Sequence, residues 1–147
     1  MRAVVTRVTS ASVTIAGEVT GRIGQGFLVL LGVGPRDTRD QAVKLADKIL
    51  GLRVFEDENQ KMNRSLSAVG GELLVVSQFT LYADTRSRRP GFTGAAKPEL
   101  AEPLYEFFLE ECARRGFPPQ HGRFGADMAV ASVNDGPVTI LFDTDAR

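Results

Sequence analysis

Polar side chains follow an apolar run near the middle of the chain. Residues 73–76, Leu-Leu-Val-Val, are typical of a buried strand, and Ser77, Gln78 and Thr80 come directly after it. Burying such hydroxyl and amide groups without partners costs roughly 1–3 kcal/mol each. These groups therefore either find partners inside the fold or face a pocket at the end of the strand, where α/β proteins commonly bind ligands.

Several catalytic classes are disfavoured by the residues that the sequence lacks. The chain has one histidine, His121, and one cysteine, Cys112, so no set of zinc ligands stands at a recognisable spacing. A Ser-His-Asp triad would have to use His121, which lies in a proline-rich connector, and Cys112 falls on the apolar face of a predicted helix. Residues 32–35, Gly-Val-Gly-Pro, lack the third glycine and the following helix of a dinucleotide-binding loop. We therefore expect no metal ion and no organic cofactor.

The remaining candidates are a hydrolase without an ionisable catalytic group, or a protein that is not an enzyme. An activated ester can be hydrolysed by orientation and by hydrogen-bond donors aimed at the developing oxyanion. The backbone N–H groups of Phe79 and Thr80 could supply those donors. Thr80 could instead be a covalent nucleophile, but its hydroxyl would need a base and the sequence offers none nearby. If the strand continued regularly, Ser77 and Phe79 would face one side and Gln78 and Thr80 the other, so some would act through the backbone.

A second distinctive stretch is Asn-Asp-Gly-Pro-Val-Thr at residues 134–139, which lies between two apolar runs. Gly-Pro is a turn signal, so the stretch predicts a hairpin turn between two strands. Bonds that precede proline can also be cis, which would point the carbonyl groups of Gly136 and Pro137 in unusual directions.

Hydrophobic periodicity predicts the elements that must position these residues. Strands are expected at residues 2–8, 11–15, 18–23, 27–33, 52–55, 73–76, 128–133 and 138–142. One amphipathic helix runs from Asp37 or Thr38 to Gly51. A second ends at Gly116 and either begins near Pro103 or is kinked there. This order predicts a single α/β domain over residues 1–147, with a mixed sheet and two main helices packed against it.

Composition agrees with a soluble globular protein, because 43% of the 147 residues are hydrophobic and 24% are charged. No apolar run is long enough to span a membrane, and a single cysteine fits a reducing cytosol. The chain has 18 basic and 18 acidic residues, which argues against an extended nucleic-acid duplex footprint but not against contact with a short single-stranded end. Arg86, Arg88 and Arg89 stand in the loop 85–97, where they are either solvated or in contact with phosphates.

The stretches 77–81, Ser-Gln-Phe-Thr-Leu, and 134–139 together resemble the D-aminoacyl-tRNA deacylases, once called D-tyrosyl-tRNA deacylases. The likeness covers nearly the whole chain. Further matching segments are 7–9, 11–13, 17–19, 30–33, 61–63 and 122–128. The resemblance implies a cytoplasmic homodimer with a partly closed, barrel-like sheet, an active site shared between subunits, and no cofactor.

The resemblance also implies a reaction. The family hydrolyses the ester between a D-amino acid, or misattached glycine, and the 3′ end of tRNA, and it spares L-aminoacyl-tRNA. Catalysis is assigned to the segment Ser77, Gln78, Phe79 and Thr80, and the 2′-hydroxyl of the terminal adenosine takes part. Participation of that hydroxyl would explain why the sequence lacks a catalytic base.

Selection between D and L substrates is assigned by the resemblance to Gly136 and Pro137, a cis dipeptide that reaches into the partner subunit's site. Its carbonyl groups leave no room for an L side chain. Arg7 is similar to the family's arginine that holds this dipeptide in place. The alternative interpretation is that Arg7 is a surface residue on a strand. Phe124 and Met128 are similar to positions near the adenosine end of the substrate, and they fit the core equally well.

Two rival functions stay open. The first is a non-catalytic RNA-binding module that uses the arginine loop, against which the zero net charge counts. The second is a general esterase or amidase with Thr80 as nucleophile, which predicts a covalent acyl-enzyme. In each case we expect no membrane and no DNA as a partner.

Overall fold

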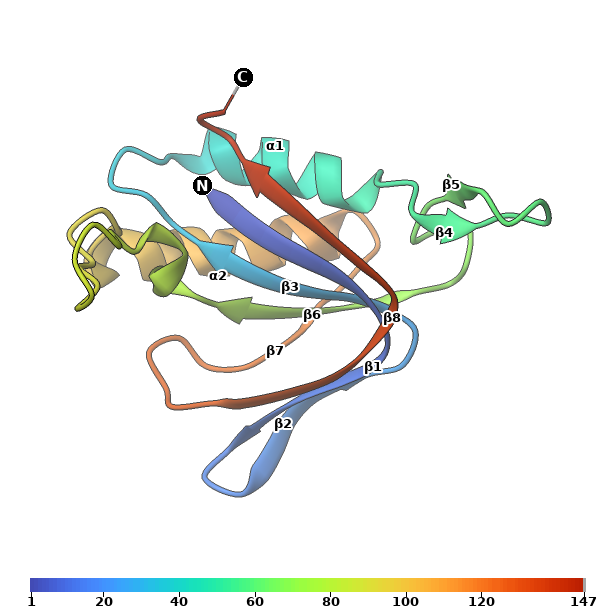
Figure 1. Cartoon of the computed structure of the whole chain (residues 1–147), viewed down its shortest axis with the longest axis horizontal. Coiled ribbons are helices and arrows are strands. Elements are labelled where there is room, and N and C mark those ends of the chain that lie inside the picture. Colours follow the sequence, from blue (N-terminus) through green and yellow to red (C-terminus); the bar gives the residue numbers. More distant parts are fainter. Residues whose placement is uncertain (147) are drawn as a thin grey trace.

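A strongly bent mixed sheet carries two helices on one face (Figure 1). The computed structural model describes residues 1–146, so residue 147, the last of the predicted domain, lies outside the described residues. The strands are β1 (Arg2–Ile15), β2 (Glu18–Ile23), β3 (Gly26–Gly32), β6 (Glu72–Ser77), β7 (Gln120–His121) and β8 (Ala129–Asp143), with a separate hairpin of β4 (Phe55–Glu56) and β5 (Met62–Arg64). The helices are α1 (Arg39–Leu50), the short 3₁₀ helix η1 (Phe79–Tyr82) and α2 (Pro98–Arg114).

The strand β1 organises the sheet because it pairs with three others. One edge of β1 pairs with β8 along most of its length, and the other edge pairs first with β3 and then with β2. The two strands predicted at 2–8 and 11–15 are therefore wrong as separate elements. The exposed residues Thr9 and Ser10 mark the point where β1 changes partner, and the ladder with β8 continues past them through a bulge.

The strand β8 is also one element where the sequence predicted two. Thr6 pairs with Thr139 and Val8 with Asn134, so two positions along β1 correspond to five along β8. The three extra residues form a bulge, and the Gly136–Pro137 bond within it is cis. The predicted hairpin turn is wrong, because β1 continues beside the bulge and both halves of β8 keep pairing with it.

The central strands β3 and β6 are buried on both faces, as expected from their uninterrupted apolar runs. Alternate side chains enter two cores. The core under the helices contains Phe27, Val29, Leu31, Leu73 and Val75 from these strands. The other core contains Leu28, Leu74 and Val76 and lies inside the curved part of the sheet.

The curvature brings the two ends of the sheet close together. A Cβ atom built on Gly21 in β2 would lie 3.0 Å from the backbone oxygen of His121 in β7. The sheet is therefore a nearly closed barrel, which confirms the predicted mixed, barrel-like architecture with two main helices.

Local sequence signals set the ends of the two helices. Thr38 is the N-cap of α1 and forms a capping box with Gln41, and Gly51 is its C-cap, as predicted. The helix α2 begins at Pro98 and runs through Pro103 without interruption. The strand predicted at 52–55 is wrong in its limits, because only Phe55 and Glu56 form β4, paired with β5 outside the main sheet.

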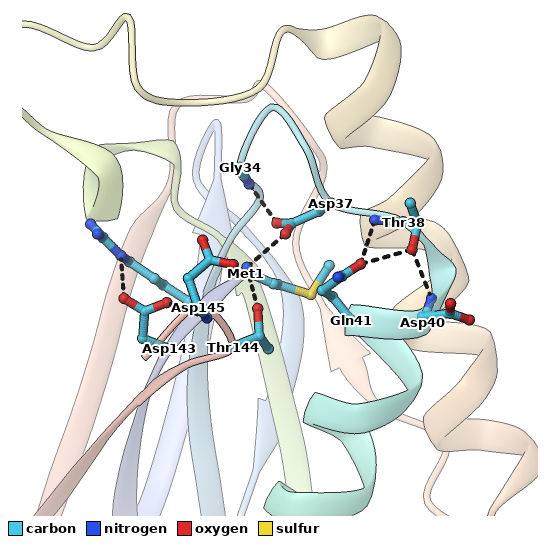
Figure 2. A network of polar contacts seen from close by, with 10 residues as sticks. Met1, Gly34, Asp37, Thr38, Asp40, Gln41, Asp143, Thr144 and Asp145 are labelled. Carbon is cyan, nitrogen blue, oxygen red and sulfur yellow. Dashed lines mark hydrogen bonds and ion pairs between the residues drawn. The ribbon is translucent and has the colours of Figure 1, made fainter. Parts of the chain in front are cut away.

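The start of β1 is tied to two neighbouring segments (Figure 2). The α-ammonium group of Met1 is buried, donates to Asp37 Oδ1 at 2.8 Å and donates to the Thr144 hydroxyl at 2.7 Å. Asp37 also accepts a bond from the N–H of Gly34 at 2.6 Å. These contacts join β1 to the loop before α1 and to the end of β8. No helix within residues 1–146 is long and apolar enough to cross a membrane.

Candidate active site

The polar segment at the end of β6 leaves the sheet as soon as the strand ends. The N–H of Gln78 still donates to the carbonyl of Leu31 at 2.8 Å, and the chain then turns into η1. Alternation between two faces therefore stops at Ser77 and does not separate the four predicted residues. Ser77 and Gln78 are half-buried, whereas Phe79 and Thr80 are exposed, so the segment faces outward at one end of the sheet.

Two backbone donors of this segment are free. Within residues 1–146, the N–H groups of Phe79 and Thr80 make no hydrogen bond, as expected for the first residues of a helix. The side-chain amide of Gln78 donates to the Thr80 hydroxyl. An amide is not a base at neutral pH, so nothing in contact with this hydroxyl among the described residues could activate it as a nucleophile.

The position of η1 is set by Arg2, a residue that the sequence did not indicate. The Nη1 of Arg2 donates to the carbonyl of Leu81 at 2.9 Å, and its guanidinium lies 4.4 Å from the centre of the Tyr82 ring. Its Nε donates to Asp143 Oδ2 at 3.1 Å. Burial raises the pKa of the Tyr82 hydroxyl, which has no partner among the described residues. No local pattern could have found this contact, because Arg2, Leu81 and Asp143 meet only through strand pairing.

The Arg7 side chain supports the Gly136–Pro137 bulge by binding Asp135, the residue before Gly136. This side chain is only 6% exposed, so the surface alternative for it is wrong. Its Nη1 donates to the carbonyl of Val54 at 2.6 Å, and its Nε lies 3.3 Å from both the carbonyl and the Oδ2 of Asp135. Gly136 has φ of +117°, and a Cβ atom there would lie 3.0 Å from Arg7 Nη2, so the site favours glycine.

The structure does not bring the two motifs together within one chain. Ser77 on β6 pairs with Leu31 on β3, which in turn pairs with Ala3 on β1. Ala3 lies four residues before Arg7 on the same strand. Four residues span about 13 Å, and the three strand spacings between β6 and β8 add about 14 Å sideways. Figure 1 shows η1 at one end of the sheet and the bend in β8 at the opposite end.

Phe124 and Met128 lie in the segment that follows β7. Because β7 runs parallel to β6, this segment leaves the sheet at the same end as Ser77. Phe124 is half-buried, with its ring 6.1 Å from the ring of Tyr105, and Met128 is half-buried against the second core. Both residues thus pack as core residues at the end of the sheet that carries η1.

The two residues set aside by elimination lie on α2 and β7. Cys112 is buried, and burial raises the pKa of its thiol to about 12, so the prediction of a buried small hydrophobe is confirmed. His121 is exposed, and its Nδ1 donates to the carbonyl of Gly122 at 2.7 Å. Among residues 1–146, no three or more histidine, cysteine, aspartate or glutamate side chains are grouped so as to hold a metal ion.

Known proteins with similar sequences cover the whole length of the chain. The family described as D-Tyr-tRNA(Tyr) deacylase matches residues 4–143. A D-aminoacyl-tRNA deacylase of Herpetosiphon aurantiacus is 57% identical over 145 residues, which is 98% of this chain and 95% of that protein. A D-aminoacyl-tRNA deacylase of Lacticaseibacillus casei is 56% identical over 148 residues and covers 100% of both chains.

Two solved structures share the fold. One is titled c-Myc DNA Unwinding Element Binding Protein. It is 45% identical, with a TM-score of 0.93 over 99% of this chain and 100% of its own. The other, titled a probable eukaryotic D-amino acid tRNA deacylase, has a TM-score of 0.82 over 96% and 97% of the two chains at 17% identity, so it supports the fold alone. By its sequence and its fold, the chain belongs to the D-Tyr-tRNA(Tyr) deacylase family.

Proposed function

We propose that the chain is a D-aminoacyl-tRNA deacylase, which hydrolyses the ester between a D-amino acid, or glycine, and the 3′ end of tRNA. Membership of the family and the names of relatives at 56–57% identity support this activity. The observation that carries it is the pair of free N–H groups on Phe79 and Thr80 at the exposed start of η1.

These two donors suit the chemistry of ester cleavage. When water attacks the ester carbonyl, its oxygen gains negative charge, and donors already in place stabilise that charge without reorganisation. Gln78 and Ser77 orient the substrate beside them, and the tRNA 2′-hydroxyl assists the attack. An ester is activated enough for orientation and oxyanion stabilisation to suffice, so no ionisable catalytic residue is required.

The chiral test is assigned to Gly136 and Pro137 of a second copy of the chain. Within one chain the bulge and η1 are about 20 Å apart by strand spacing, so the bulge cannot reach its own site. In a homodimer the carbonyl groups of the dipeptide form a rigid wall against the amino acid, and Arg7 holds that wall in place. A wall of backbone atoms rejects an L side chain without reading its identity.

Exposed apolar side chains on β8 support this dimer. Val133 is 58% exposed and Leu141 is 77% exposed, on the strand that carries the Gly136–Pro137 bulge. They lie on the two sides of the bulge and would be shielded from water if this strand packed against a second copy. We place the activity in the cytoplasm, where aminoacyl-tRNA is made and used, and we assign it to one domain spanning the chain.

The first test is amino acid release from D-Tyr-tRNA, L-Tyr-tRNA and Gly-tRNA in the presence of a chelator. We expect hydrolysis of the D-tyrosyl and glycyl esters while the L-tyrosyl ester stays intact. Hydrolysis of all three would overturn the chiral wall and favour a general esterase. Hydrolysis of none, with the tRNA still bound, would favour the RNA-binding module. Activity that disappears only with the chelator would show that a metal ion is needed.

A further inference from the structure

Positive charge is concentrated in the segment that follows η1. Residues 84–97 contain Arg86, Arg88, Arg89 and Lys97 against the single acidic Asp84, so they carry a net charge of +3. The whole chain is neutral, which means that the rest of it carries −3. The segment begins two residues after the end of η1 and is exposed from residue 85 to residue 94.

The arginines of this segment have different roles. The backbone groups of Asp84 and Gly91 exchange hydrogen bonds of 2.7 Å and 2.9 Å and close the loop at its base. Arg86 is paired with the carboxylate of Asp84 at 2.6 Å, so it shapes the loop. Arg88 and Arg89 lie at the exposed tip, and their side chains contact no acceptor within residues 1–146.

The loop is fixed beside the candidate active site. The ring of Phe92, just after the closing pair, packs edge-on against the ring of Phe79 at 5.1 Å. Figure 1 shows the loop at the outer edge of the molecule, next to η1 and at the opposite side from β4 and β5. A substrate bound at the N–H groups of Phe79 and Thr80 therefore has the two free arginines next to its path away from the protein.

We propose that Arg88 and Arg89 bind backbone phosphates of the tRNA beyond its CCA end, an assignment that rests on the proposed function. Guanidinium groups form bidentate bonds to phosphate and are enriched where proteins contact nucleic acid backbones. The arginines lie outside the segment that holds the ester, so they contribute to binding of the polynucleotide and not to the chemical step. The loop thereby gives a neutral protein a local site for a polyanion.

The experiment compares two substrates that share the ester. One is D-Tyr-tRNA, and the other is the D-tyrosyl ester of the CCA trinucleotide, which lacks the stem. For the Arg88→Ala/Arg89→Ala variant we expect KM for the full tRNA to rise about tenfold, with kcat unchanged and the trinucleotide unaffected. The slope of log(kcat/KM) against log[salt] should become shallower by about 1.5, corresponding to two lost phosphate contacts.

Two further variants serve as controls. Arg88→Lys/Arg89→Lys keeps the charge and should keep most of the salt dependence. Lys44→Ala/Lys48→Ala removes the same charge from exposed positions on α1 and should change neither substrate's KM. Equal losses on both substrates, or no loss on either, would overturn the proposal.

Binding of uncharged tRNA separates this proposal from the proposed function. Fluorescence anisotropy of labelled tRNA needs no hydrolysis, and we expect the Kd of the Arg88→Ala/Arg89→Ala variant to rise about tenfold. If the wild-type protein hydrolyses neither ester but this shift is seen, the deacylase activity fails while the phosphate contacts stand. Equal affinity of variant and wild type for tRNA would overturn the contacts even in an active enzyme.

Discussion

The hydroxyl of Thr80 receives a hydrogen bond from the Gln78 amide and has no base beside it among the described residues. We therefore expect Thr80→Ala to keep kcat/KM for D-Tyr-tRNA within about tenfold of wild type, because the backbone donor at this position remains. Loss of a true oxyanion donor costs about a hundredfold to a thousandfold. Thr93→Ala, in the exposed loop nearby, is the matched control. A complete loss of activity, with an acyl-enzyme seen by mass spectrometry in the wild type, would establish a threonine nucleophile instead.

Arg7 is a buried cation whose donors bind the carbonyls of Val54 and Asp135. In Arg7→Met these acceptors lose their partner, and we expect the free energy of unfolding to fall by about 2 kcal/mol. This loss is smaller than for a fully buried ion pair, because the Asp135 side chain is 38% exposed. The measurement is urea denaturation, and the control variant is Arg22→Met, at an exposed position on β2.

The same variant tests the chiral wall. Below its unfolding transition, Arg7→Met should hydrolyse L-Tyr-tRNA faster relative to D-Tyr-tRNA, because the bulge that carries Gly136 has lost its support. An unchanged ratio of the two rates in a destabilised protein would mean that Arg7 stabilises the fold and plays no part in selection.

At the scale of elements, the short helix η1 depends on a side chain from β1. Arg2 binds the Leu81 carbonyl, stacks on Tyr82 and pairs with Asp143, so it orients the helix whose first N–H groups are the proposed oxyanion donors. We expect Arg2→Ala to lower kcat at least about tenfold with little change in KM, because small displacements of catalytic groups affect the chemical step most. Arg2→Lys should recover part of the loss.

A structural role alone would give a different result. If Arg2 only stabilised the fold, Arg2→Ala would lower the melting temperature while kcat per folded molecule stayed unchanged. Single-turnover kinetics well below the melting temperature distinguishes the two cases.

At the scale of the molecule, the distance between the two motifs means that the proposed chiral wall would have to come from a second copy of the chain. We expect the wild-type protein to sediment as a dimer, and a Val133→Asp/Leu141→Asp variant to sediment as a monomer that no longer discriminates D-Tyr-tRNA from L-Tyr-tRNA. Val19→Asp, at an apolar position 49% exposed on β2, should stay dimeric. A monomer that keeps full activity and full discrimination would contradict the shared site.

The sequence alone predicts the parts that depend on neighbouring residues. Capping residues place α1, the apolar runs predict β3 and β6 with both faces buried, and the single histidine and single cysteine disfavour familiar catalytic sites. The two polar motifs also identify the family, because each is a contiguous run of residues whose chemistry can be read directly. Burial of Cys112 follows in the same way from helical periodicity.

Tertiary pairing decides the parts that depend on distant residues. The turn signal at Gly136–Pro137 produces a bulge and not a hairpin, because β1 pairs with β8 on both sides of it. The clamp of Arg2 on η1 and the burial of Arg7 likewise arise where remote strands meet. The separation of the two motifs follows from the strand order, since two strands lie between β6 and β8. A local pattern contains no information on strand order, and so it could not show that the two motifs lie at opposite ends of the sheet.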